Sequence, residues 1–164
     1  MKKLEKIILK NLFLNEPFVR KILPYLKNEY LQEKSERVLF EEVQKYVLQY
    51  NQIPTHEAIQ ISLNNRENLF EEEFKKCSEL IDEVQKDTEA TPNDWLLTET
   101  EKFCQEKAIH NAILESIQIL DGKIKTDKSK GSIPKILSDA LSVSFDPNIG
   151  HDYLEDFESR FEFY

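Results

Sequence analysis

The sequence predicts an all-α protein in which a small helical globule is followed by a long antiparallel helical hairpin and a C-terminal linker helix. Only three of the 164 residues are glycine, which disfavours a turn-rich β fold. Apolar residues recur at helical spacing through most of the chain. Between Pro92 and Gly122 neither glycine nor proline occurs, so a single helix could rise about 45 Å there. We therefore expect a globule over residues 1–90, a hairpin over 91–145 and the start of a linker over 146–164.

The first predicted helix covers residues 2–13, and a second helix follows it. The first helix has one apolar face, and its lysines are expected to face solvent. Asn15 can cap the second helix, Pro17 fits its first turn, and Pro24 should end it. The apolar faces consist of Leu4, Ile7, Ile8 and Leu12 in the first helix and of Phe18, Ile22 and Leu26 in the second, and the expected solvent-facing lysines are Lys2, Lys3, Lys6 and Lys10.

Three further helices complete the predicted globule. The third runs from Ser35 to Tyr50, a turn follows to Pro54, and Thr55 caps the fourth. The fifth spans about residues 70–86 and carries many acidic side chains, which are typical of a solvated face. The residues expected to face inward are Leu39, Val43, Tyr46, Val47 and Tyr50 in the third helix, Ala58, Ile59 and Leu63 in the fourth, and Phe70, Phe74, Cys77, Ile81 and Val84 in the fifth.

The polar run from Lys86 to Thr91 is expected to be a hinge, after which the hairpin begins. Thr91 can cap the long helix, and Pro92 sits where its missing N–H costs nothing. Gly122 can adopt the left-handed conformation that ends a helix. A lysine-rich turn over residues 123–131 then leads to a second helix that returns beside the first.

The hairpin carries more apolar residues than two helices can cover for each other. A bare two-helix arm would therefore leave apolar surface in water, and such surface usually marks an interface. We expect the hairpin to be the element through which copies of the chain associate. The candidate self-association residues are Ile109, Ile113, Ile117, Leu120, Ile136, Leu137 and Leu141.

The last segment is expected to form an amphipathic linker helix. Pro147 and Gly150 lie in a breaker-rich stretch that separates it from the hairpin. Its aromatic residues recur on one side, and acidic residues occupy most of the other positions. Such a helix could fold back on the globule or dock on another domain, and we favour docking. The candidate docking residues are Tyr153, Phe157, Phe161 and Tyr164.

The charge balance disfavours tight nucleic-acid binding by this chain. Its formal net charge is −9, whereas neutralisation of phosphates by lysine and arginine supplies most non-specific affinity. One locally basic spot occurs in the hairpin turn, where a solvated loop is the favoured interpretation. The lysines of this turn are Lys123, Lys125, Lys128 and Lys130. No stretch approaches the length of a membrane span, so no membrane partner is expected.

No catalytic motif is complete in the sequence. Gly122 and Lys123 lack the flanking residues of a phosphate-binding loop, so no nucleotide cofactor is expected here. The pair His151 and Asp152 could belong to a metal-dependent phosphohydrolase with further histidines, His56 or His110, but too few residues follow it.

The two cysteines, Cys77 and Cys104, are far apart in the sequence. Neither has a second cysteine at metal-ligand spacing, so neither a zinc site nor a disulfide framework is indicated. We therefore predict no catalytic, cofactor or metal site in the chain.

Several C-terminal segments resemble the DnaB-like hexameric replicative DNA helicases of the T-even bacteriophage type. The similar segments are Ile133 to Leu137, Ala140 to Asp146, Gly150 to Tyr153 and Asp156 to Arg160, with looser similarity at Asp94 to Leu96, Glu99 to Lys102 and Leu23 to Tyr25. The resemblance implies an N-terminal domain that forms a collar over six motor domains and docks primase or a helicase loader.

The resemblance also implies what this chain lacks. The parent protein would be an ATP-dependent 5′ to 3′ helicase in the cytoplasm of an infected bacterium, with ATP and magnesium bound by a motor domain that has no counterpart here. One alternative is a stand-alone helical adaptor that recruits replication or transcription factors, and a lesser one is the metal-dependent phosphohydrolase. The adaptor is expected to end in a capped helix, whereas this chain stops within an aromatic pattern.

Overall fold

The computed structural model describes residues 4–122 and 130–144, which form seven α-helices and two 3₁₀ helices. No strand occurs in these residues, so the predicted all-α class is confirmed. The chain divides into two compact units, Met1–Cys104 and Gln105–Tyr164, which we call the first and second units. This division lies inside the long helix α6 (Asn93–Asp121), later in the chain than the boundary at residue 90 that the sequence suggested.

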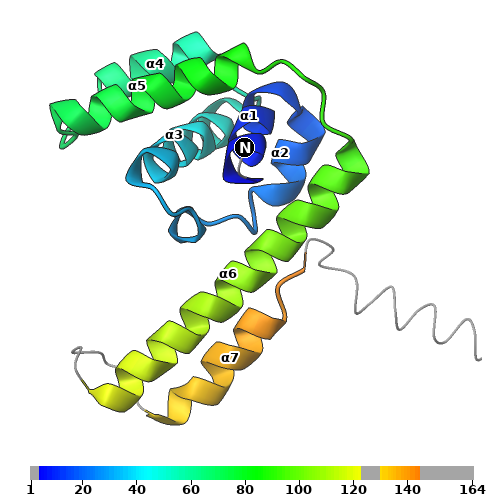
Figure 1. Cartoon of the computed structure of the whole chain (residues 1–164), viewed down its shortest axis with the longest axis vertical. Coiled ribbons are helices and arrows are strands. Elements are labelled where there is room, and N and C mark those ends of the chain that lie inside the picture. The colour runs from blue at the N-terminus through cyan, green and yellow to red at the C-terminus, as the bar shows by residue number, and fades with distance from the viewer. Residues whose placement is uncertain (1–3, 123–129, 145–164) are drawn as a thin grey trace, which may run out of the picture. The chain divides into compact units, whose positions relative to one another are not determined.

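The first unit is arranged around α3 (Lys34–Tyr50). This helix packs against α1 (Leu4–Leu14), α4 (His56–Asn64), α5 (Glu71–Lys86) and the 3₁₀ helix η1 (Asn28–Tyr30), as Figure 1 shows. The short helix α2 (Glu16–Ile22) packs on α1. The largest fully buried side chains are Ile8, Leu9, Leu12, Phe18, Ile22, Leu26, Leu31, Leu39, Phe40, Ile59, Leu63 and Ile81.

Two of the helix caps that the sequence predicted in the first unit, Asn15 and Thr55, are confirmed. Asn15 Oδ1 accepts a hydrogen bond of 3.1 Å from the backbone N–H of Phe18 at the start of α2. Thr55 Oγ1 accepts one of 3.1 Å from Ala58 at the start of α4. Helix α3 begins one residue earlier than predicted, because Glu33 and Glu36 form a reciprocal capping box.

Three side chains lie in environments that the sequence pattern predicted wrongly. Lys10 was expected in solvent, yet it is only 4% exposed because the segment after α5 covers it. Tyr50 was expected inside but is 54% exposed at the last position of α3. Phe70 is 73% exposed because it precedes the first helical residue of α5 and so lies outside its repeating face.

Helix α6 begins at Asn93, one residue later than predicted, so Pro92 and not Thr91 is the residue that precedes it. The helix ends where the sequence predicted. The N–H of Leu96 donates to the carbonyl of Pro92 at 2.9 Å, and the hydroxyl of Thr91 accepts from α1. Gly122 has φ of +63°, and its N–H donates to Gln118 at 3.1 Å. The left-handed glycine that ends the helix is thereby confirmed.

The second unit is an antiparallel helical hairpin. Its second helix, α7 (Ile133–Leu141), follows a short 3₁₀ helix η2 (Lys130–Ser132) and runs back beside α6 (Figure 1). The chain joins the two helices at one end of the hairpin. At the other end, Gln105 Nε2 donates to the carbonyl of Val143 at 3.0 Å.

His56 lies in the first unit with its ring stacked on Phe13. The ring centroids are 4.3 Å apart and the planes differ by 16°. Its Nε2 is buried and has no hydrogen-bond partner among the described residues. Burial lowers the pKa of His56 from its ordinary value of 6.5, because the charged imidazole would be poorly solvated there.

We predict that this histidine makes the chain less stable in acid. The unfolded chain takes up a proton on His56 before the folded chain does, so stability is complete above pH 6.5 and falls as the pH drops below it. His56→Phe should keep the stack and flatten the decline in urea midpoint between pH 7 and pH 5. His110→Phe, which replaces an exposed histidine, is the control. Equal slopes for both variants would refute the role of His56.

Candidate functional site

The predicted self-association residues of the hairpin are largely uncovered. Ile113, Ile117 and Leu120 of α6 are each about half exposed, and Leu141 of α7 is 71% exposed. The remaining predicted residues, Ile109, Ile136 and Leu137, are half-buried. Each hairpin helix therefore keeps apolar surface in contact with water.

The buried row of α6 in the second unit consists mainly of small side chains. Ala108, Ala112 and Ser116 lie one turn apart and are at most 8% exposed, and Ile119 continues the row. The Ser116 hydroxyl donates to the carbonyl of Ala112 at 2.7 Å, so this buried polar group is satisfied within its own helix. Gln105, whose side chain reaches the end of α7, falls on the same row at helical spacing. The row therefore faces α7, on which Ala140 is the buried residue.

Four of the exposed apolar residues of the two helices lie on one side of the hairpin. Each of them follows a buried residue by one position: Ile113 follows Ala112, Ile117 follows Ser116, Leu120 follows Ile119, and Leu141 follows Ala140. One residue turns a helix by about 100°. Because α6 and α7 run in opposite directions, the residue after the facing row lies on the same side of the hairpin in both helices. These four residues therefore form one surface, which we call the apolar edge.

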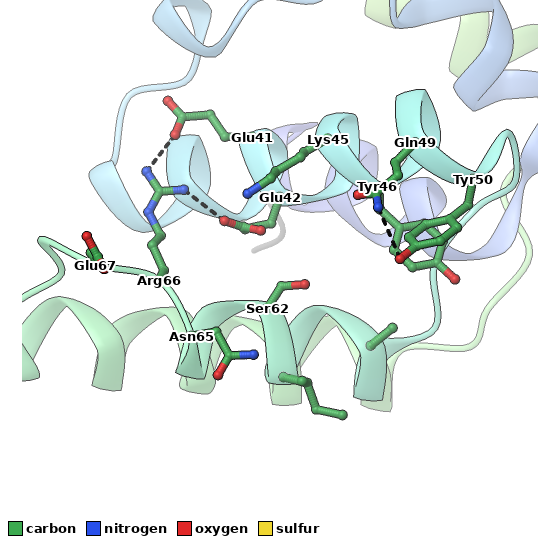
Figure 2. A pocket seen from close by; sticks show the side chains of 12 residues that line it. Glu41, Glu42, Lys45, Tyr46, Gln49, Tyr50, Ser62, Asn65, Arg66 and Glu67 are labelled. Atoms are coloured by element: carbon green, nitrogen blue, oxygen red, sulfur yellow. Dashed lines mark hydrogen bonds and ion pairs between the residues drawn. The ribbon is translucent and has the colours of Figure 1, made fainter.

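A second candidate site is a groove between α3 and α4, with a volume of about 890 Å³. Figure 2 shows the side chains that line it from both helices and from the turn after α4. The lining residues are Glu41, Glu42, Lys45, Tyr46, Gln49, Tyr50, Ala58, Ile61, Ser62, Asn65, Arg66 and Glu67.

One end of the groove is a polar network around Arg66. Its guanidinium donates to Glu41 at 2.7 Å and to the buried carboxylate of Glu42 at 3.1 Å (Figure 2). Asn28 also donates to Glu41. Burial works to lower the pKa of Arg66, but the hydrogen bonds and negative charges of Glu41 and Glu42 outweigh it, so this pKa is raised. The network fixes this end of the groove in one geometry.

The other end of the groove is apolar and exposed. The rings of Tyr46 and Tyr50 lie 4.7 Å apart at 46°, and Gln49 Nε2 donates to the Tyr50 hydroxyl at 3.3 Å (Figure 2). Ile61, on α4, is 60% exposed. Aromatic rings next to amide and hydroxyl groups are typical of surfaces that bind peptide segments. The sequence pattern placed both tyrosines in the core and so did not reveal this surface.

No catalytic or metal site emerges from the described residues. They contain no group of three or more His, Cys, Asp or Glu side chains that could hold a metal ion. Cys77 and Cys104 are buried free thiols, and burial raises the pKa of Cys104 to about 12. None of the described helices is long and apolar enough to cross a membrane.

Several predicted features lie outside the described residues. These are the pair His151 and Asp152, the turn lysines Lys123, Lys125 and Lys128, and the linker residues Tyr153, Phe157, Phe161 and Tyr164.

Comparison with known proteins confirms the resemblance that the C-terminal segments suggested. The chain is 31% identical over 162 residues to the DnaB-like replicative helicase of Enterobacteria phage T4. The match covers 94% of this chain, and the chain spans 34% of the length of that helicase. No family model matches the chain.

We predict that Arg66 stabilises the first unit through the buried carboxylate of Glu42. Arg66→Met would leave that carboxylate without its counter-charge, which should cost about 1 to 3 kcal/mol of unfolding free energy, less than for a fully buried pair because Arg66 is 29% exposed. Lys76→Met removes an exposed pair with Glu72 and should cost less than about 0.5 kcal/mol. Urea unfolding measures both, and similar losses would show that Glu42 does not depend on Arg66.

Proposed function

We propose that this chain is the N-terminal collar domain of a phage-type DnaB-like replicative DNA helicase, acting in the cytoplasm of the infected bacterium. The observation that carries the proposal is the alignment of nearly the whole chain with about a third of a replicative helicase. In this proposal the remainder of the parent protein is a RecA-like motor that binds ATP and magnesium and moves 5′ to 3′ on single-stranded DNA. The collar domain itself has no catalytic role.

In this proposal the apolar edge is the surface through which copies of the domain associate. Burying one leucine or isoleucine side chain contributes about 1.5 to 3 kcal/mol, so a few of them can offset the entropy lost on association. Ile113, Ile117, Leu120 and Leu141 are exposed in the isolated chain and lie on one side of the hairpin. A second hairpin could cover all four together.

The proposed collar also docks primase or a helicase loader. The groove between α3 and α4 supports this part, because it combines a fixed polar end with exposed Tyr50 and Ile61. The linker segment from residue 151 is proposed to dock on the motor of a neighbouring subunit.

The alternative is a stand-alone helical adaptor for replication or transcription factors. Like the proposed collar, an adaptor would have no catalytic role, and it could use the same groove to bind its partners. The two functions differ in self-association, which an adaptor does not require and a collar does.

We predict that charge on the apolar edge prevents self-association. Ile117→Asp and Leu141→Asp should each shift the chain to monomer at concentrations where the unaltered chain is oligomeric, because an interface cannot desolvate an unpaired carboxylate cheaply. Both variants should remain helical, since both positions are exposed. Sedimentation across concentration and circular dichroism measure the two effects.

The matched control is Leu114→Asp. Leu114 is 45% exposed in the same helix but does not follow a buried residue, so it lies off the apolar edge. It should leave the oligomer intact. The proposal fails if the wild-type chain stays monomeric at high micromolar concentration. It also fails if Leu114→Asp dissociates the oligomer as much as the edge variants do.

We predict that the isolated chain neither hydrolyses ATP nor binds single-stranded DNA tightly at physiological salt. The sequence lacks a phosphate-binding loop, and the net charge of −9 repels a phosphate backbone. Phosphate release and fluorescence anisotropy with a labelled oligonucleotide measure these activities. Sub-micromolar DNA binding would show that the lysine-rich turn is a contact surface.

A further inference from the structure

The segment that joins α5 to α6, residues 87–92, contributes no buried apolar side chain to the core of the first unit. Val84 is the last buried residue of α5, and Leu96 is the next buried residue along the chain. None of the residues from 85 to 95 is buried. This segment, which we call the connector, therefore depends on polar contacts for its position.

These contacts come from α1 and from the residue that follows it. Lys10 Nζ donates to the carbonyl of Glu89 at 2.9 Å and lies 3.4 Å from the carboxylate of Asp87. Asn11 Nδ2 donates to the Thr91 hydroxyl at 3.1 Å. Beyond the connector, Asn15 Nδ2 donates to the Asn93 side chain at 3.2 Å. The contacts follow one another in order along both segments.

The connector can lift without leaving a buried polar group unsatisfied. Lys10 is only 4% exposed when the connector is in place, so closure removes an ammonium group from water. The desolvation of Lys10 offsets part of the attraction of its contacts, so they favour the closed state by only a modest free energy. When the connector lifts, Lys10 returns to water, and Asn11 keeps its hydrogen bond of 2.8 Å to Ile7. Opening is therefore inexpensive compared with unfolding of the packed helices.

We propose that the connector is a latch, which Lys10 and Asn11 hold closed and which opens locally while the helices of the first unit stay packed. The open latch releases the end of α5 and the first turn of α6 from α1. Leu96, Thr100 and Cys104, which have no exposed surface, keep the rest of this part of α6 in place. The latch therefore acts as a hinge in the first unit at the start of α6.

Cleavage of the 164-residue chain by a glutamate-specific protease tests the latch, because Glu89 is an exposed residue at the centre of the connector. Lys10→Met keeps a buried side chain of similar length but removes both contacts to the connector. It should raise the rate of cleavage after Glu89 about tenfold, because cleavage follows the population of the open form. The unfolding midpoint should change little.

Lys6→Met is the matched control. Lys6 also joins α1 to α5, through Glu83 at 2.7 Å, and this ion pair lies outside the connector. Its cleavage rate after Glu89 should stay within twofold of the unaltered chain. Thr91→Val, which removes the acceptor of Asn11, is a second variant should Lys10→Met fail to fold, and it should raise cleavage severalfold.

Two results would overturn the latch. Equal cleavage rates in Lys10→Met and Lys6→Met would show that Lys10 does not hold the connector. A rise in cleavage that is matched by an equal fall in the free energy of unfolding would show that the protease acts on the unfolded chain and that no local opening exists.

Discussion

The first unit depends on the burial of α3 between its neighbours. Leu39, Phe40 and Val43 have no exposed surface, and the helix that carries them packs against α1, α4, α5 and η1. No other element of the unit has so many neighbours, so the positions of the remaining helices are set by how they fit onto α3. The groove follows from this arrangement, because one of its walls is the side of α3 that α4 leaves uncovered.

The sequence was most informative where structure is local. Asn15, Thr55 and Gly122 act within a few residues of their own position, and all three end or begin helices as predicted. The apolar periodicity likewise identified each α-helix found within residues 4–122 and 130–144. The buried state of Lys10 could not be predicted in this way, because its partner carbonyl at Glu89 is 79 residues away. Periodicity shows that a helix has an apolar and a polar face. It does not show which distant segments pack on either face.

The same limit explains what was found and missed in the candidate sites. The apolar edge was predicted in outline because an excess of isoleucine and leucine is visible in the sequence. The buried row was less visible, since Ala108 and Ser116 are small or polar and carry little hydrophobic signal. The tyrosines of the groove were assigned to the core because their spacing places them on the inner face of α3. The spacing does not show whether another element covers that end of the helix.

If copies of the chain associate through the apolar edge, its placement on one side of the hairpin limits how assemblies can grow. A surface on one side of the hairpin can be covered by only one neighbour at a time. Two copies related by a two-fold axis can bury this surface completely against each other. An assembly made through this edge alone would stop at a pair. A closed ring of six would then consist of three pairs, with alternate interfaces of different composition, and the contact between pairs would have to come from another surface of the chain.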